Sequence, residues 1–153
     1  MRLNEYPVIT YYLKQAESML KNECFLGLLL ISATLAELMT REFAGNSGQD
    51  NYARLLKELL SKSRISQGQY ETLDRIRIIR NQYIHLNVGS IIQNFDGLGI
   101  IDEKGVVTFL NETIDTMNCT STDVLNYFKL HLRARSLQAF LLTKKALDAF
   151  STE

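Results

Sequence analysis

Apolar side chains recur along most of this chain at the three- to four-residue spacing of amphipathic helices. The only proline, Pro7, falls in an opening turn, so no proline interrupts the later helices. The pattern predicts an all-α fold, an up-and-down bundle of about five helices. We expect helices over residues 5–21, 25–43, 51–60, from just after Ser66-Gln67-Gly68-Gln69 to about Leu86, and from about 121 through 150.

Several residues with capping chemistry mark the ends of these helices. Asp50 can cap the third helix, and Ser66 with Gln69 has the spacing of a capping box before the fourth. Gly45 suits a left-handed cap after the second helix. The apolar run of residues 25–36 is shorter than the roughly 20 residues that span a bilayer, which predicts a buried core helix and no membrane association.

Residues 88–120 form an inserted segment before the last helix. Two short β-branched runs around a polar turn, within residues 99–109, predict a small β-hairpin there. A tolerated surface excursion is the preferred interpretation of the insertion, and a partner-binding or cleft-covering element is the alternative. Because no repeat or linker divides the chain, residues 1–153 are predicted to form a single domain.

Composition places the chain among ordinary globular proteins, with 46% hydrophobic and 22% charged residues. Seventeen basic and seventeen acidic residues cancel overall, yet residues 54–85 carry seven basic against three acidic side chains. Residues 94–123 carry one basic against six acidic. Two isolated cysteines and two distant histidines predict no metal site, no cofactor is indicated, and a reducing cytoplasm is the expected location.

Candidate chemistry is concentrated at the end of the fourth helix, in the run Arg80-Asn81-Gln82-Tyr83-Ile84-His85. Arginine presents a planar, permanently charged fork that suits phosphate, and histidine exchanges a proton near neutral pH. Together they predict a phosphodiester site. His131 and Arg135, one helical turn apart in the last helix, could add phosphate contacts, but a solvated face is the preferred interpretation.

A helical wheel separates the members of this motif. Arg77, Asn81 and His85 follow one another at four-residue steps on one face, whereas Arg80 lies about 140° from His85. Either the long arginine reaches around a frayed helix end, or a second copy of the helix supplies the missing half. Ile78 and Ile84 border the polar face and favour the second solution, a symmetric dimer interface.

Glu37 continues an apolar strip of the second helix and needs a partner if it is buried. Arg41, one turn further along, is the preferred partner. Arg80 is the functional alternative, in which Glu37 supports the candidate site. Both alternatives remain open at this point.

The block from Arg80 to His85 resembles the HEPN superfamily, whose motif is an arginine, a four-residue spacer and a histidine, often with asparagine after the arginine. The resemblance extends to the helical architecture and to the acidic residue in the second helix. It implies a metal-independent endoribonuclease of toxin or defence type that acts as a homodimer on RNA. A cognate antitoxin or other regulatory protein is the further partner implied.

Carried over by residue, the resemblance assigns the proton transfer to His85, the phosphate to Arg80 and an orienting role to Asn81. We add Arg77 and Tyr83 as substrate-binding residues, although Tyr83 also falls on the core-facing stripe with Ile76 and Ile79. Some family toxins carry a tyrosine two residues after the histidine. That position is Asn87 here, so adenylylation of a tyrosine at that site is excluded.

Two other classes of function remain open. The same basic face could hold RNA or a nucleotide without cutting it, which would make the protein a non-catalytic binding module. Alternatively, Arg80 and His85 could serve only as hydrogen-bonding residues of a structural dimer or partner-binding interface. The second alternative requires every buried polar group of the interface to have a hydrogen-bond partner, because a buried polar group without one costs free energy.

Overall fold

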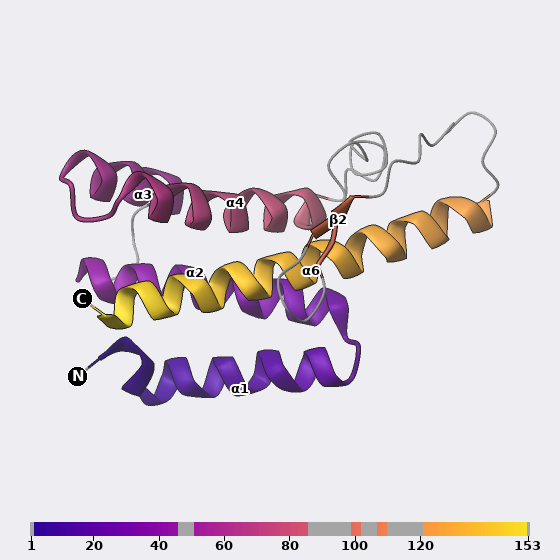
Figure 1. The fold of residues 1–153 in the computed structure, drawn as a ribbon, viewed down its shortest axis with the longest axis horizontal. Coiled ribbons are helices and arrows are strands. Elements are labelled where there is room, and N and C mark those ends of the chain that lie inside the picture. Colours follow the sequence, from indigo (N-terminus) through magenta and orange to yellow (C-terminus); the bar gives the residue numbers. More distant parts are fainter. Residues whose placement is uncertain (1, 46–50, 86–98, 102–106, 110–120, 153) are drawn as a thin grey trace.

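The computed structural model describes residues 2–45, 51–85, 99–101, 107–109 and 121–152 (Figure 1). This part of the chain is mostly helical, which confirms the all-α prediction. The helical elements are a short 3-10 helix η1 (Leu3–Glu5), α1 (Pro7–Lys21), α2 (Phe25–Ala44), α3 (Tyr52–Ser61), α4 (Gln67–Ile84) and the long α6 (Ser121–Thr152).

Two three-residue strands, β1 (Gly99–Ile101) and β2 (Val107–Phe109), pair antiparallel. Gly99 lies opposite Phe109, and Ile101 lies opposite Val107. Both strands belong to the predicted insertion of residues 88–120, and the rest of that segment lies outside the described residues.

The helix ends follow the capping chemistry of the sequence. The Ser66 hydroxyl accepts a hydrogen bond from the Gln69 N–H at 3.1 Å, and the Ser66 N–H donates to the Gln69 side chain at 2.8 Å, so the capping box is confirmed. Gly45 ends α2 at a φ of 68°, a left-handed conformation that glycine adopts without strain. The cap of α3 was predicted wrongly: Asn51, not Asp50, precedes the helix and accepts the Arg54 N–H at 3.3 Å.

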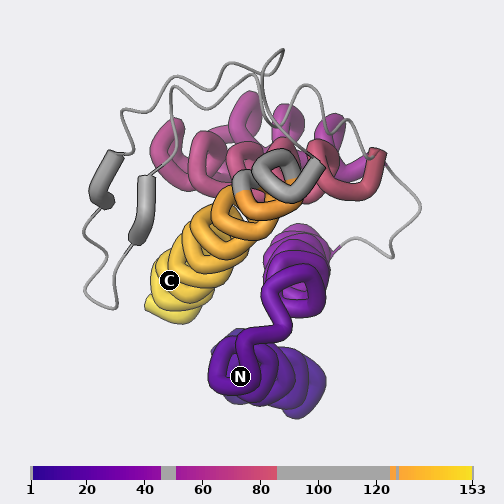
Figure 2. The backbone as a smooth tube through the Cα atoms, turned by 90° about the vertical axis from the view of Figure 1, so that its right-hand side faces the viewer, coloured from indigo at the N-terminus to yellow at the C-terminus, as the bar shows by residue number. Residues whose placement is uncertain are grey.

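The helices pack around a central pair formed by α2 and α6. Figure 2 views them nearly end-on, with α2 and α6 side by side, α4 above both and α1 beneath α2. The N- and C-termini lie at the same end of the molecule (Figure 1). The C-terminal turn of α4, which holds the candidate motif, lies at the end of that helix away from the two termini (Figure 1).

Buried apolar side chains hold this arrangement together, and their burial is the main favourable term in folding. The expected core helix is confirmed in part: Leu28, Leu29 and Leu35 of α2 are fully buried, whereas Leu26 and Leu30 are exposed. The core-facing stripe of α4 is confirmed at Ile76, Ile79 and Tyr83. Besides the main core, a small separate cluster of Leu29, Ile79, Tyr83 and Ala139 joins α2, α4 and α6 beside the motif.

Candidate functional site

The last turn of α4 carries the motif, and the helix ends inside it. Arg80 and Asn81 lie within the helix, whereas His85 is the residue that follows it and donates its backbone N–H to the Asn81 carbonyl at 3.1 Å. The His85 side chain is exposed, and Arg80 and Asn81 are half-buried. The three candidate catalytic residues therefore differ in their access to solvent.

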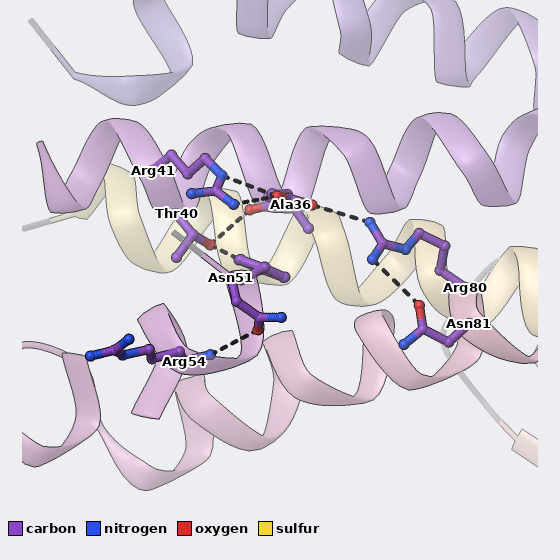
Figure 3. Close-up of polar contacts among 9 residues, drawn as sticks. Ala36, Thr40, Arg41, Asn51, Arg54, Arg80 and Asn81 are labelled. Carbon is purple, nitrogen blue, oxygen red and sulfur yellow. Dashed lines mark hydrogen bonds and ion pairs between the residues drawn. The ribbon is translucent and has the colours of Figure 1, made fainter. Parts of the chain in front are cut away.

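Glu37 of α2 is the centre of the polar contacts around Arg80. One of its oxygens, Oε2, accepts a hydrogen bond from the Arg80 guanidinium at 3.1 Å. The other, Oε1, accepts two from Arg41, from Nε at 3.0 Å and from a terminal nitrogen at 2.7 Å. Figure 3 shows Arg41 and Arg80 directed toward one another along α2. Glu37 therefore binds both of the partners proposed from the sequence, Arg41 and Arg80.

Two permanent cations, Arg41 and Arg80, share the Glu37 carboxylate in this arrangement. The Arg80 guanidinium also donates to the Asn81 side-chain oxygen at 3.4 Å, a contact drawn in Figure 3. Among the described residues, the buried Arg80 Nε has no hydrogen-bond acceptor. Glu37 therefore orients Arg80, and because Nε is buried, an anion could approach only the rest of this side chain, which is 25% exposed.

A second layer of side chains supports this group from α3. The Thr40 hydroxyl lies 3.1 Å from the Tyr52 hydroxyl, and it also lies 2.7 Å from the Ala36 carbonyl that it donates to. The Arg41 guanidinium carbon lies 5.9 Å from the centre of the Tyr52 ring, within reach of a cation–π attraction. Burial raises the pKa of Tyr52 to about 12, so its hydroxyl stays protonated.

The face of α4 that the sequence assigned to a dimer remains open in the single chain. Ile78 is 38% exposed and Ile84 is 51% exposed. Arg77, predicted to bind substrate, donates from its Nε to the Asp74 carboxylate at 2.7 Å, and both side chains are only partly exposed. A phosphate would therefore have to compete with the Asp74 carboxylate for the Arg77 guanidinium.

Tyr83 corrects the sequence-based assignment, which placed it among the substrate-binding residues. It is only 3% exposed, and its hydroxyl shares a short hydrogen bond with Nδ1 of His131 on α6. Because the Tyr83 side chain is almost completely buried, it cannot touch a substrate in this conformation. The core-facing position of Tyr83 on the helical wheel was the stronger signal, because side chains on that stripe are turned toward the core.

His131 and Arg135 also depart from expectation, because the preferred interpretation placed them on a solvated face. His131 is 1% exposed and Arg135 is 7% exposed. Burial, together with the nearby charge of Arg135, lowers the pKa of His131 to about 4. Burial likewise raises the pKa of Tyr83 and lowers that of Arg135. Tyr83 therefore stays protonated and can donate to a neutral His131 at neutral pH.

The fold brings Glu37, Arg80 and Asn81 together, but it does not bring His85 to them. Within the described ranges, no side-chain hydrogen bond or ion pair joins His85 to Arg80 or to Asn81. Arg80 points to α2 of its own chain, and His85 extends from the end of α4. This agrees with the angular separation on the helical wheel.

No group of three or more His, Cys, Asp or Glu side chains among the described residues is arranged to hold a metal ion. None of the described helices has both the length and the apolar character needed to cross a bilayer. Comparison of the chain with protein-family models, with curated proteins and with solved structures finds no match.

Proposed function

We propose that this protein is a metal-independent endoribonuclease whose cleft is shared between two copies of the chain. One observation carries the proposal: Arg80 is anchored by Glu37 at 3.1 Å with Asn81 beside it, while a histidine five residues later is exposed. An oriented cation for the phosphate and an accessible proton carrier are the two groups that RNA cleavage by its own ribose requires.

The reaction follows from the roles of these side chains. The ribose 2′-oxygen attacks the adjacent phosphorus and forms a new P–O bond, while the bond from phosphorus to the 5′-oxygen breaks. His85 takes the 2′-hydroxyl proton, and the leaving 5′-oxygen takes up a proton in exchange, from the same histidine or from water. Arg80 stabilises the charge that develops on the phosphate oxygens. DNA lacks the 2′-hydroxyl, so it is not a substrate.

A second copy is part of the proposal because of the direction of Arg80. Its guanidinium is held on its own α2, whereas His85 lies beyond the end of α4 without a contact to it among the described residues. Ile78 and Ile84 offer an exposed apolar border on the same helix. Packing two such faces around a two-fold axis would place the His85 of one copy near the Arg80 of the other.

The decisive experiment incubates the purified protein with mixed cellular RNA in the presence of a chelator. His85→Ala and Arg80→Ala should each abolish cleavage, and an all-deoxy oligonucleotide should stay intact. Arg54→Ala is the matched control, because it removes an exposed arginine of α3 while the backbone N–H that closes the cap remains. Cleavage that survives His85→Ala in a folded protein would overturn the catalytic assignment.

The second candidate is a non-catalytic RNA- or nucleotide-binding module. It is favoured by the absence, among the described residues, of any side-chain group that orients the His85 ring, since catalytic histidines are commonly held by a partner. Intact RNA that is nevertheless bound, with binding lost in Arg80→Ala, would select this function. If the wild-type protein neither cleaves nor binds RNA, the remaining function is that of a structural dimer or partner-binding domain.

A further inference from the structure

The buried pair of Tyr83 and His131 lies on the side of α4 opposite His85 and is not part of the proposed chemistry. Tyr83 follows Arg80 by three residues, so the two side chains leave neighbouring positions on the same turn. The Tyr83 hydroxyl bonds to His131, and its ring packs at a tilt on Phe128, with centroids 5.9 Å apart. A contact that fixes the rotation of α4 at Tyr83 therefore also fixes the direction in which the Arg80 side chain leaves the helix.

We propose that Tyr83 and His131 are positioning residues, which set the rotation of the last turn of α4 on α6 and so keep Arg80 against Glu37. The pair acts through Arg80 and does not touch a substrate. Its consequence for cleavage rests on the proposed function, whereas its consequence for the geometry of α4 does not.

The packing at this end of the molecule explains why one hydrogen bond matters. Most buried side chains belong to the main core, but the end of α4 is held by a separate cluster with four buried members, Leu29, Ile79, Tyr83 and Ala139. Apolar packing is non-directional, so a small cluster tolerates rotation of the helix. Within the described residues, the bond of Tyr83 to His131 is the one side-chain hydrogen bond between α4 and α6.

The surroundings of His131 also suit a fixed, neutral acceptor. Tyr83 faces it from α4, Arg135 faces it from its own helix α6, and Leu29 of α2 contributes only an apolar side chain to the cluster. Arg75 of α4 acts on Arg135 with a further positive charge. Burial and then the positive charge of Arg135 oppose protonation of the His131 ring, which keeps Nδ1 available to accept a hydrogen bond from Tyr83 at neutral pH.

The test is amide hydrogen exchange, measured residue by residue at constant pH in the full chain. Tyr83→Phe keeps the ring and removes only the hydroxyl, and His131→Asn alters the same bond from α6. Both should lower protection at least tenfold at residues 81–85, while protection at Leu73 and Ile76 in the middle of α4 stays the same. Thr143→Val is the control, because it removes another buried hydroxyl of α6, which bonds to the Ser32 carbonyl at 3.1 Å.

The two possible roles give different outcomes. If the pair is merely structural, protection falls evenly along α4, as it should in Thr143→Val, and the proposal is wrong. It is equally wrong if neither Tyr83→Phe nor His131→Asn changes residues 81–85. Where wild-type protein cleaves RNA, Tyr83→Phe should lower kcat at least tenfold with little change in KM. Absence of wild-type cleavage would overturn the proposed function alone, because the exchange measurement does not depend on it.

Discussion

Glu37 of α2 and Arg80 of α4 form an ion pair of 3.1 Å, although 43 residues separate them in the sequence. The same carboxylate is bound by Arg41 on its own helix. Glu37 therefore joins the candidate phosphate-binding residue to the core helix of the protein. Its removal should affect both the stability of the fold and the orientation of Arg80.

Glu37→Gln keeps the size of the side chain and removes the negative charge that Arg41 and Arg80 share. We expect the free energy of unfolding to fall by roughly 1–3 kcal/mol, since the pair is partly buried and hydrogen-bonded. Urea denaturation at neutral pH measures this. Glu58→Gln is the control, because its pair with Lys62 is mostly exposed and should contribute less than about 1 kcal/mol. Equal losses in the two variants would contradict a special role for Glu37.

Acidification should weaken the fold through His131. Its folded pKa of about 4 lies below the ordinary 6.5, so the unfolded chain takes up a proton first as the pH falls. The stabilisation is present above pH 6.5 and is lost progressively between there and about pH 4, at up to about 1.4 kcal/mol per pH unit. Urea denaturation at several pH values in this window should show a shallower pH dependence for His131→Asn. The same slope in both proteins would argue against burial of a neutral ring.

A composite cleft predicts complementation between two inactive variants. Arg80→Ala and His85→Ala should each be inactive alone, but a mixed dimer keeps one site with an intact arginine from one chain and an intact histidine from the other. After unfolding and refolding an equal mixture, about a quarter of the wild-type cleavage rate should return, from random pairing of a two-fold dimer. The rate of cleavage of a labelled RNA measures it. A mixture that stays inactive although mixed dimers form would place both residues in the same chain's site.

The exposed isoleucines of α4 test the interface itself. Ile84→Asp introduces a charge into a contact that the proposal buries, so the protein should become monomeric and lose cleavage, which light scattering and RNA assays measure. Because Ile84 is 51% exposed in the single chain, stability should change by no more than about 0.5 kcal/mol. Val8→Asp, at a 56% exposed position of α1, should leave the dimer intact. Loss of the dimer in both variants would point to a different interface.

Local patterns were sufficient to predict much of the fold. The three- to four-residue spacing of apolar side chains located the core face of α4, because a helix places such residues on one side. The capping box of Ser66 and Gln69 marked the start of α4, because its hydrogen bonds join residues three apart. The cap of α3 was misplaced by one residue, since Asp50 and Asn51 have similar capping chemistry.

The burial of His131 and Arg135 could not be predicted from local sequence patterns. In sequence they lie four residues apart with Arg133 between them, which was interpreted as a solvated face. They are buried because α6 is covered on that side by α4, whose Tyr83 lies 48 residues away. The only available signal was Tyr83 itself, a hydroxyl on a core-facing stripe that needs a buried partner.

The sequence by itself determined the helical class, the core-facing stripe of α4 and the angular separation of Arg80 from His85, because each depends on positions within one helix. Tertiary structure decided that Glu37 binds Arg41 and Arg80 together and that Tyr83 meets His131. These contacts depend on which helices become neighbours and at what rotation. That choice is made by the packing of the whole core, so no single segment of the sequence contains it.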